Sequence, residues 1–191
     1  MLPNASAPAA GGRSRLAAAP RQVGLVLAGV LLIAASAQIN VPMYPVPTTL
    51  QTLAVLALGA VGGWRYGAAT AAGYLAAGLI GLPVFAQWTP APGATFLALK
   101  TGGYVLGFLP AAALAGALAA RHRGSLLRLA GIMLLGHAVV FAFGVPWLAA
   151  FVGWTGAAAF GLTPFLWGSL VKSALGASLI VAAGRLRRAP G

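Results

Sequence analysis

Long apolar runs separated by short gaps restrict the fold of this chain more than any other feature of its sequence. A helix needs about 20 apolar residues to cross a hydrocarbon core of roughly 30 Å. Six runs reach or approach that length: Gln22–Gln38, Leu50–Gly63, Gly67–Leu82, Thr101–Ala120, Ser125–Phe143 and Pro164–Gly184. We therefore expect an all-α membrane protein, built as a compact bundle of six transmembrane helices.

Proline-rich segments separate several of these runs. Proline removes a backbone N–H and disfavours helix in the residue before it, so we expect loops at Asn40–Thr49 and Pro83–Lys100. By the same reasoning, Gly144-Val145-Pro146 is expected to break the fifth helix before a Trp-rich connection through Thr163. The first run has a competing interpretation as a secretory signal peptide, because Ala35-Ser36-Ala37 resembles a cleavage site.

The arginines indicate how the helices are oriented. Six spans would place all ten arginines on one side, in the N-terminal arm, at Arg65, from Arg121 to Arg128 and in the tail from Arg185. The positive-inside rule makes that side cytoplasmic, so we expect both termini inside and a multi-pass protein of the bacterial inner membrane. We also expect a disordered basic arm over 1–21, a six-helix domain over 22–184 and a basic tail over 185–191.

The chain has a net charge of +12 but no Asp, Glu or Cys, and this composition excludes several classes of function. The arginines form short flanks rather than a stripe, which disfavours a nucleic-acid partner. Carboxylate-based catalysis, carboxylate-ligated metals and cysteine nucleophiles lack their key groups, so we expect neither an enzyme nor a cofactor. No phosphate-binding loop of the G-x-x-x-x-G-K-[ST] type is present. If transport uses ATP, a partner must therefore hydrolyse it.

The two lysines, Lys100 and Lys172, lie toward the side that has no arginine. A cation inside a span usually faces the protein interior or a water-filled cavity, and no acidic side chain is available to pair with it. A pocket around these lysines would favour an anionic ligand. The alternative is that both side chains snorkel to lipid headgroups. For His137, in mid-span, a hydrogen bond between helices is favoured over contact with a ligand.

Several motifs, in the right order, resemble the BioY family. They are Ala-Gln-Ile-Asn-Val-Pro (37–42), Pro-Val-Pro-Thr-Thr-Leu-Gln-Thr (45–52), Tyr-Leu-Ala-Ala-Gly (74–78), Gly-Leu-Pro-Val-Phe-Ala (81–86), Thr-Gly-Gly-Tyr (101–104) with Gly-Phe (107–108), and Pro-Phe (164–165) followed by Lys172. Members are the biotin-specific substrate-binding (S) components of energy-coupling-factor (ECF) transporters. The resemblance implies high-affinity biotin binding and uptake together with a transmembrane coupling protein and two ABC-type ATPases.

The resemblance also implies a site beneath the outer loops. On this basis we expect Lys100 and Lys172 to hold the carboxylate of biotin, and Gln87, with Asn40 or Ser169, to bond its ureido group. Tyr74, Phe85 and Tyr104 are expected to pack on its rings. Ser169 departs from the family pattern, which has an acidic residue there, and Lys100 stands where many relatives have proline or arginine.

Gly24 and Ala28 lie four residues apart in the first run, a spacing that lets helices approach closely. Internal packing and docking of the coupling protein are both compatible with that pair. Two functional alternatives also remain. One is a stand-alone carrier of biotin or another small anion that needs no ATPase, and the other is a structural or lipid-binding membrane protein.

Overall fold

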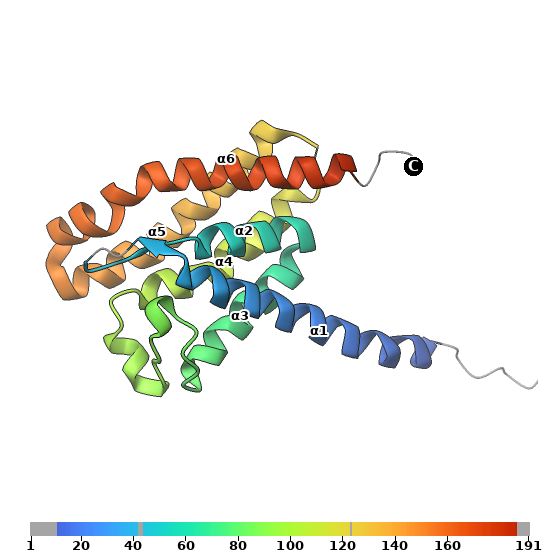
Figure 1. Ribbon diagram of the computed structural model, residues 1–191, viewed down its shortest axis with the longest axis horizontal. Coiled ribbons are helices and arrows are strands. Elements are labelled where there is room, and N and C mark those ends of the chain that lie inside the picture. The colour runs from blue at the N-terminus through green and yellow to red at the C-terminus, as the bar shows by residue number, and fades with distance from the viewer. Residues whose placement is uncertain (1–10, 42–43, 123, 187–191) are drawn as a thin grey trace, which may run out of the picture.

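A computed structural model of the chain describes residues 11–41, 44–122 and 124–186. Its elements, in chain order, are α1 (Gly11–Gln38), β1 (Asn40–Val41), β2 (Thr48–Thr49), α2 (Gln51–Gly62), α3 (Trp64–Leu79), η1 (Ala86–Trp88), η2 (Gly93–Ala98), α4 (Gly102–Ala119), α5 (Leu126–Ala157), η3 (Ala158–Leu162) and α6 (Thr163–Leu186). The described part is thus helical apart from one two-stranded hairpin, which confirms the expected all-α class (Figure 1).

Within the described residues, three stretches are long and apolar enough to cross a membrane. They are Pro20–Gln38, Gly102–Ala119 and the continuous stretch Leu126–Leu186, which contains both α5 and α6. The helix Gln51–Gly62 is apolar but shorter.

The first helix begins earlier than the sequence predicted. α1 starts at Gly11 rather than Gln22 and contains Pro20. Alanine has the highest helix propensity, and the segment before Pro20 reads Leu-Ala-Ala-Ala. The arm that was expected to be disordered is therefore helical from Gly11 in this structure. Residues 1–10 of that arm, and 187–191 of the expected tail, lie outside the described residues.

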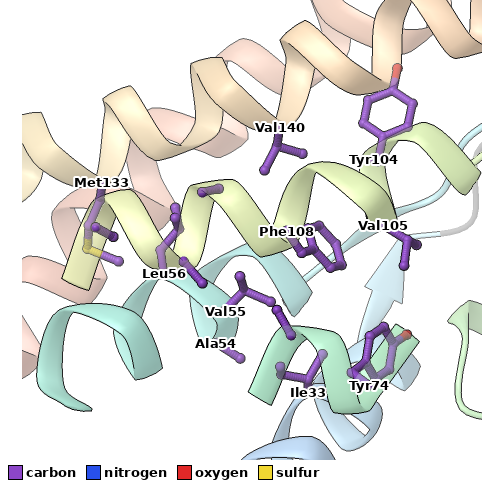
Figure 2. Close-up of a cluster of buried hydrophobic side chains, with 14 of the residues drawn as sticks. Ile33, Ala54, Val55, Leu56, Tyr74, Tyr104, Val105, Phe108, Met133 and Val140 are labelled. Atoms are coloured by element: carbon purple, nitrogen blue, oxygen red, sulfur yellow. The ribbon is translucent and has the colours of Figure 1, made fainter. Parts of the chain in front are cut away.

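Glycines let α2, α3 and α4 pack with their backbones in contact. A Cβ added to Gly59 of α2 would lie 2.3 Å from the carbonyl oxygen of Ala112 in α4. A Cβ added to Gly67 of α3 would lie 2.7 Å from the Cα of Gly59. Such close approach is typical of membrane helices, which gain little from burying apolar surface and rely on close packing instead. Figure 2 shows α4 inside this core, with Val140 of α5 on one side and Val55 of α2 on the other.

The predicted break at Gly144–Pro146 is wrong, because α5 continues through Pro146 to Ala157. Membrane helices tolerate proline where neighbouring groups compensate for the lost hydrogen bond. The glycine serves packing, since a Cβ on Gly144 would lie 2.3 Å from the ring of Tyr104. The backbone departs from helical angles only later, at Gly153 (φ 73°, ψ 166°). The expected connection through Thr163 is therefore the end of α5 followed by η3, a single π-helical segment.

The hairpin lies at one end of the bundle. The hairpin pairs Asn40 with Thr49 and Val41 with Thr48. Figure 1 shows this hairpin and η3 at the end opposite the start of α1 and the end of α6. The cavity that contains most of the buried polar side chains also lies toward the hairpin end.

Candidate functional site

A cavity lies at the hairpin end, between the segment that leads into α2, the loop after α3, and helices α4, α5 and α6. Its lining residues are Val46, Pro47, Thr49, Gln51, Thr52, Phe85, Ala86, Thr101, Tyr104, Val105, Phe108, His137, Phe141, Phe165, Ser169 and Lys172. Most are apolar or aromatic, with a few polar groups among them. This composition is typical of a site for a small organic ligand.

Lys172 brings a positive charge into this cavity. Its side chain is 7% exposed, and its ammonium donates hydrogen bonds to Oγ1 of Thr52 (2.9 Å) and to the carbonyl oxygen of Thr49 (3.2 Å). Both partners are neutral groups, and the chain has no carboxylate side chain that could balance the charge of the ammonium. An ammonium has three N–H donors, so two partners leave it able to donate to a ligand as well.

Two buried polar atoms on the same cavity lack partners. Within the described residues, Oγ of Ser169 and Nε2 of His137 are both buried and make no hydrogen bond. Buried polar groups are nearly always paired, and leaving one unpaired is costly. These two atoms are therefore candidates for contact with a ligand.

Aromatic rings form the walls. The hydroxyl of Tyr104 donates to the carbonyl oxygen of Gly161 (2.8 Å), and its ring stacks on that of Phe165 with centroids 6.4 Å apart. Phe85 contributes from the loop after α3 and lies 5.8 Å from Phe96, centroid to centroid. Such rings offer flat apolar faces on which a ligand ring can pack.

Tyr74 lies behind the cavity rather than in its lining. Its ring packs edge-on against Phe85 at 5.5 Å, its hydroxyl donates to the carbonyl oxygen of Val84 (3.0 Å), and it accepts a hydrogen bond from the amide of Gln51. Tyr74 thus fixes the Val84–Phe85 segment. Its expected packing on the rings of a ligand stays a prediction.

Lys100 does not share the cavity with Lys172. Its ammonium lies 4.4 Å from the ring centroid of Tyr44 and donates to the hydroxyl of that tyrosine (2.5 Å). It lines a second, outer hollow together with Gln87. Four residues line both hollows and so form the wall between them: Pro47, Phe85, Ala86 and Thr101. The two lysines thus line different hollows, and their expected joint contact with one carboxylate stays a prediction.

Gln87 owes its place to an unusual loop. Gln87 and Trp88 both have positive φ (58° and 57°), which non-glycine residues rarely adopt. Gln38, at the end of α1, holds this bend, since its amide donates to the carbonyl oxygen of Phe85 (3.1 Å) and accepts from the backbone N–H of Trp88 (3.1 Å). Asn40 lines neither hollow and donates to the carbonyl oxygen of Gln38 (3.0 Å).

Sequence reasoning missed part of the polar lining. Thr49, at the end of β2, and Thr52, in the first turn of α2, lie inside a recognised motif in which no role was predicted for them. Gln51 lies between them and lines the cavity as well. For His137, sequence reasoning predicted a hydrogen bond between helices but not a place in the cavity lining. It does contact α6, through Oγ of Ser173 (3.2 Å), but it also lines the cavity. The available signal for these residues was that each is polar in an otherwise apolar chain.

Gly24 and Ala28 lie on the exposed face of α1. A Cβ added to Gly24 would meet nothing within 4 Å. Internal packing instead uses Gly29, where a Cβ would lie 2.6 Å from Cγ2 of Thr70. Docking of a partner on Gly24 and Ala28 stays a prediction.

Known proteins resemble the chain over nearly its whole length. The model of the BioY family matches residues 10–189. A "Probable biotin transporter BioY" of Pyrococcus horikoshii is 35% identical over 87% of this chain and 96% of the relative. The "Biotin transporter BioY" of Thermotoga maritima is 38% identical over 78% of this chain and 88% of the relative.

A solved structure has the same fold. It is the S-component for biotin from an ECF-type ABC transporter, with a TM-score of 0.77, 23% identity, and coverage of 96% of this chain and 97% of that one. The motifs, the helical fold and the match over residues 10–189 agree, and this chain belongs to the BioY family.

Proposed function

We propose that this chain binds biotin and mediates its uptake across a membrane as the S component of an ECF-type transporter. The observation that carries the proposal is the cavity of Lys172, in which a buried ammonium without an acidic partner lies among aromatic rings and two unpaired polar atoms. The relatives and the solved structure named above support biotin as the ligand. The chain is a multi-pass membrane transport protein rather than an enzyme.

The chemistry of biotin suits two adjoining hollows. Its valerate tail ends in a carboxylate, and its ureido ring offers one carbonyl acceptor and two N–H donors. The inner cavity supplies one cationic donor, Lys172, the hydroxyl of Ser169, which can donate or accept, and the unpaired Nε2 of His137. That set complements a urea, which offers both a carbonyl and N–H groups, whereas a carboxylate would set its oxygen lone pairs against Nε2 of His137. The ureido ring therefore binds inside, with its carbonyl oxygen on Lys172.

The carboxylate then belongs in the outer hollow. Lys100 offers a positive charge there, next to Gln87, on the far side of the wall that both hollows share. This division replaces the expectation that both lysines hold the carboxylate. The apolar rings and tail of the ligand pack between Phe85 and Tyr104, which line the inner cavity.

Lysine substitutions test the division of roles. Glutamine keeps an N–H donor but no charge, so Lys172→Gln should bind biotin more tightly than Lys172→Ala, because a neutral carbonyl needs a donor rather than a charge. At position 100, glutamine and alanine should weaken binding equally. Calorimetry in detergent measures both. Equal losses for Lys172→Gln and Lys172→Ala would place the carboxylate on Lys172 and contradict the division, and unchanged affinity in both would remove Lys172 from the site.

A neutral ligand gives an independent measurement. Biotin amide lacks the carboxylate charge, so the unmodified chain should prefer biotin over the amide. That preference should disappear in Lys100→Gln and persist in Lys172→Gln. Disappearance in the Lys172 variant alone would reverse the two assignments.

We further propose six membrane crossings, both termini in the cytoplasm of a bacterium, and location in its inner membrane. The arginine distribution supports this orientation. Because the sequence has no cysteine, single cysteines introduced at Arg65 and at Val41 report sidedness without background labelling. A membrane-impermeant thiol reagent added to intact cells should label the cysteine at 41 and spare the one at 65. The opposite pattern would invert the topology.

The partners are proposed to be a transmembrane coupling protein and two ABC-type ATPases. The ECF-type transporter from which the solved structure comes supports such partners in general. Vesicles that contain this chain alone should bind biotin without accumulating it. Accumulation without added ATPases would instead establish the stand-alone carrier.

A further inference from the structure

His137 is buried in α5 with its two ring nitrogens in different surroundings. Its side chain is 2% exposed. Nδ1 lies 2.9 Å from the carbonyl oxygen of Met133, one turn earlier, and 3.2 Å from Oγ of Ser173 in α6. Nε2 is buried and lacks a hydrogen-bond partner among the described residues, and the imidazole lines the cavity of Lys172.

These contacts determine the tautomer. A carbonyl oxygen only accepts, so the 2.9 Å contact with Met133 requires a proton on Nδ1. A neutral imidazole protonated there carries a lone pair on Nε2. Protonation of both nitrogens would add a second cation to a cavity that already holds Lys172, in a chain with no carboxylate to balance either charge. The imidazole is therefore neutral, and Nε2 is a hydrogen-bond acceptor.

We propose that Nε2 of His137 accepts a hydrogen bond from one ureido N–H of biotin and makes His137 a specificity-determining residue. This inference rests on the proposed function and assigns the ligand group that His137 recognises. The ligand class is a cyclic urea or amide with an N–H donor.

Few groups in the cavity can take this role. The chain offers no Asp or Glu as an acceptor, and Oγ1 of Thr49 already donates to one of the two lone pairs on Oε1 of Gln51, at 3.0 Å. Oγ of Ser169 is unpaired but is a hydroxyl, which donates as readily as it accepts. Nε2 is the better discriminator, because a neutral nitrogen lone pair accepts and cannot donate. A ligand with oxygen in place of that N–H would meet it lone pair to lone pair.

The test compares biotin with its two cyclic carbamate analogues, in each of which an oxygen replaces one ureido N–H. Dissociation constants are measured by calorimetry for the unmodified chain and for His137→Leu, His137→Gln and His122→Leu. The control, His122, lies in the turn after α4 and contacts Arg128. Glutamine can place an amide oxygen near the position of Nε2, so His137→Gln serves as the conservative variant.

The unmodified chain should reject one of the two carbamates by about 10- to 100-fold relative to biotin, since a buried acceptor would lose its partner. In His137→Leu, biotin should bind about 10- to 100-fold more weakly, and the ratio for that carbamate should fall toward one. His137→Gln should recover part of both values, and His122→Leu should change neither. The ratio is internal to each variant and so does not depend on how much of it folds.

Two outcomes would overturn the inference while the proposed function stands. One is biotin binding by His137→Leu with unchanged affinity and an unchanged carbamate ratio. The other is weaker binding with an unchanged ratio, which would make the role of His137 structural. Failure of the unmodified chain to bind biotin would overturn the proposed function and this inference together.

Discussion

Replacing Gly144 by alanine tests how closely α5 packs against the cavity wall. The added Cβ would lie 2.3 to 2.4 Å from three ring atoms of Tyr104. Real Cβ atoms do not approach so closely, so the ring must move. That movement pulls the Tyr104 hydroxyl from the carbonyl oxygen of Gly161, 2.8 Å away, and disturbs the stack on Phe165.

The magnitude follows from three contributions. Overpacking a filled core costs about 1–3 kcal/mol. Loss of the hydrogen bond from Tyr104 to Gly161 costs about 1 kcal/mol more. Alanine offsets roughly 0.5–1 kcal/mol of this, because glycine in a helix is less favourable by that amount. We expect Gly144→Ala to lose about 1–3 kcal/mol of stability and to bind biotin about tenfold more weakly, since Tyr104 lines the cavity.

Gly131 is the matched control on the same helix. A Cβ added there would meet nothing within 4 Å, so Gly131→Ala should leave biotin affinity unchanged and stability unchanged or slightly higher. Thermal unfolding in detergent and calorimetric titration with biotin measure the two quantities.

A double-mutant cycle identifies the cause. In a Tyr104→Ala background the ring is gone, so adding Gly144→Ala should cost much less than it does alone. Equal costs in the two backgrounds, or equal behaviour of the alanine variants at 144 and 131, would refute the close packing described for α5 and α4.

The remaining predictions concern other contacts. Tyr74→Phe should lose about 1–3 kcal/mol of stability in thermal unfolding, because the Gln51 amide and the Val84 carbonyl would lose a buried partner; unchanged stability would contradict those bonds. Gly59→Ala should lower the melting temperature, because its Cβ would lie 2.3 Å from a backbone oxygen of α4 that cannot move away alone. Gly24→Leu should abolish co-purification with the coupling protein and leave biotin affinity unchanged, and normal co-purification would exclude that surface.

The apolar runs were enough to predict the helices but not all of their ends. Local signals at Pro20 and Pro146 suggested that helix is absent or broken there, yet both residues lie inside helices. Around Gly144 the reason is tertiary, because the ring of Tyr104 occupies the space that a side chain would need. No local pattern contains that contact, which joins residues on two helices.

The structure brings four of the predicted site residues to one cavity. Ser169, Lys172, Phe85 and Tyr104 all line one cavity. Their roles as ligand contacts stay predictions.

The separation of the two lysines depends instead on the path of the loop from 83 to 100. The side chain of Lys100, at the end of that loop, donates to the hydroxyl of Tyr44 and lines the outer hollow. The acceptor role of His137 depends on a carbonyl in its own helix and a serine in another, so neither feature is visible in the sequence pattern alone.

The hydrogen bonds of Lys172 also determine when the cavity can exist. They join residues 123 and 120 positions apart, from the last helix back to the start of α2. A chain made from its N-terminus inserts α1 to α5 before α6 has left the ribosome, so the cavity is the last part of the molecule to form. A ligand that binds there stabilises only the completed chain, by an amount that grows with its concentration. Biotin at a concentration well above its dissociation constant would therefore favour molecules in which α6 has packed over those in which it has not.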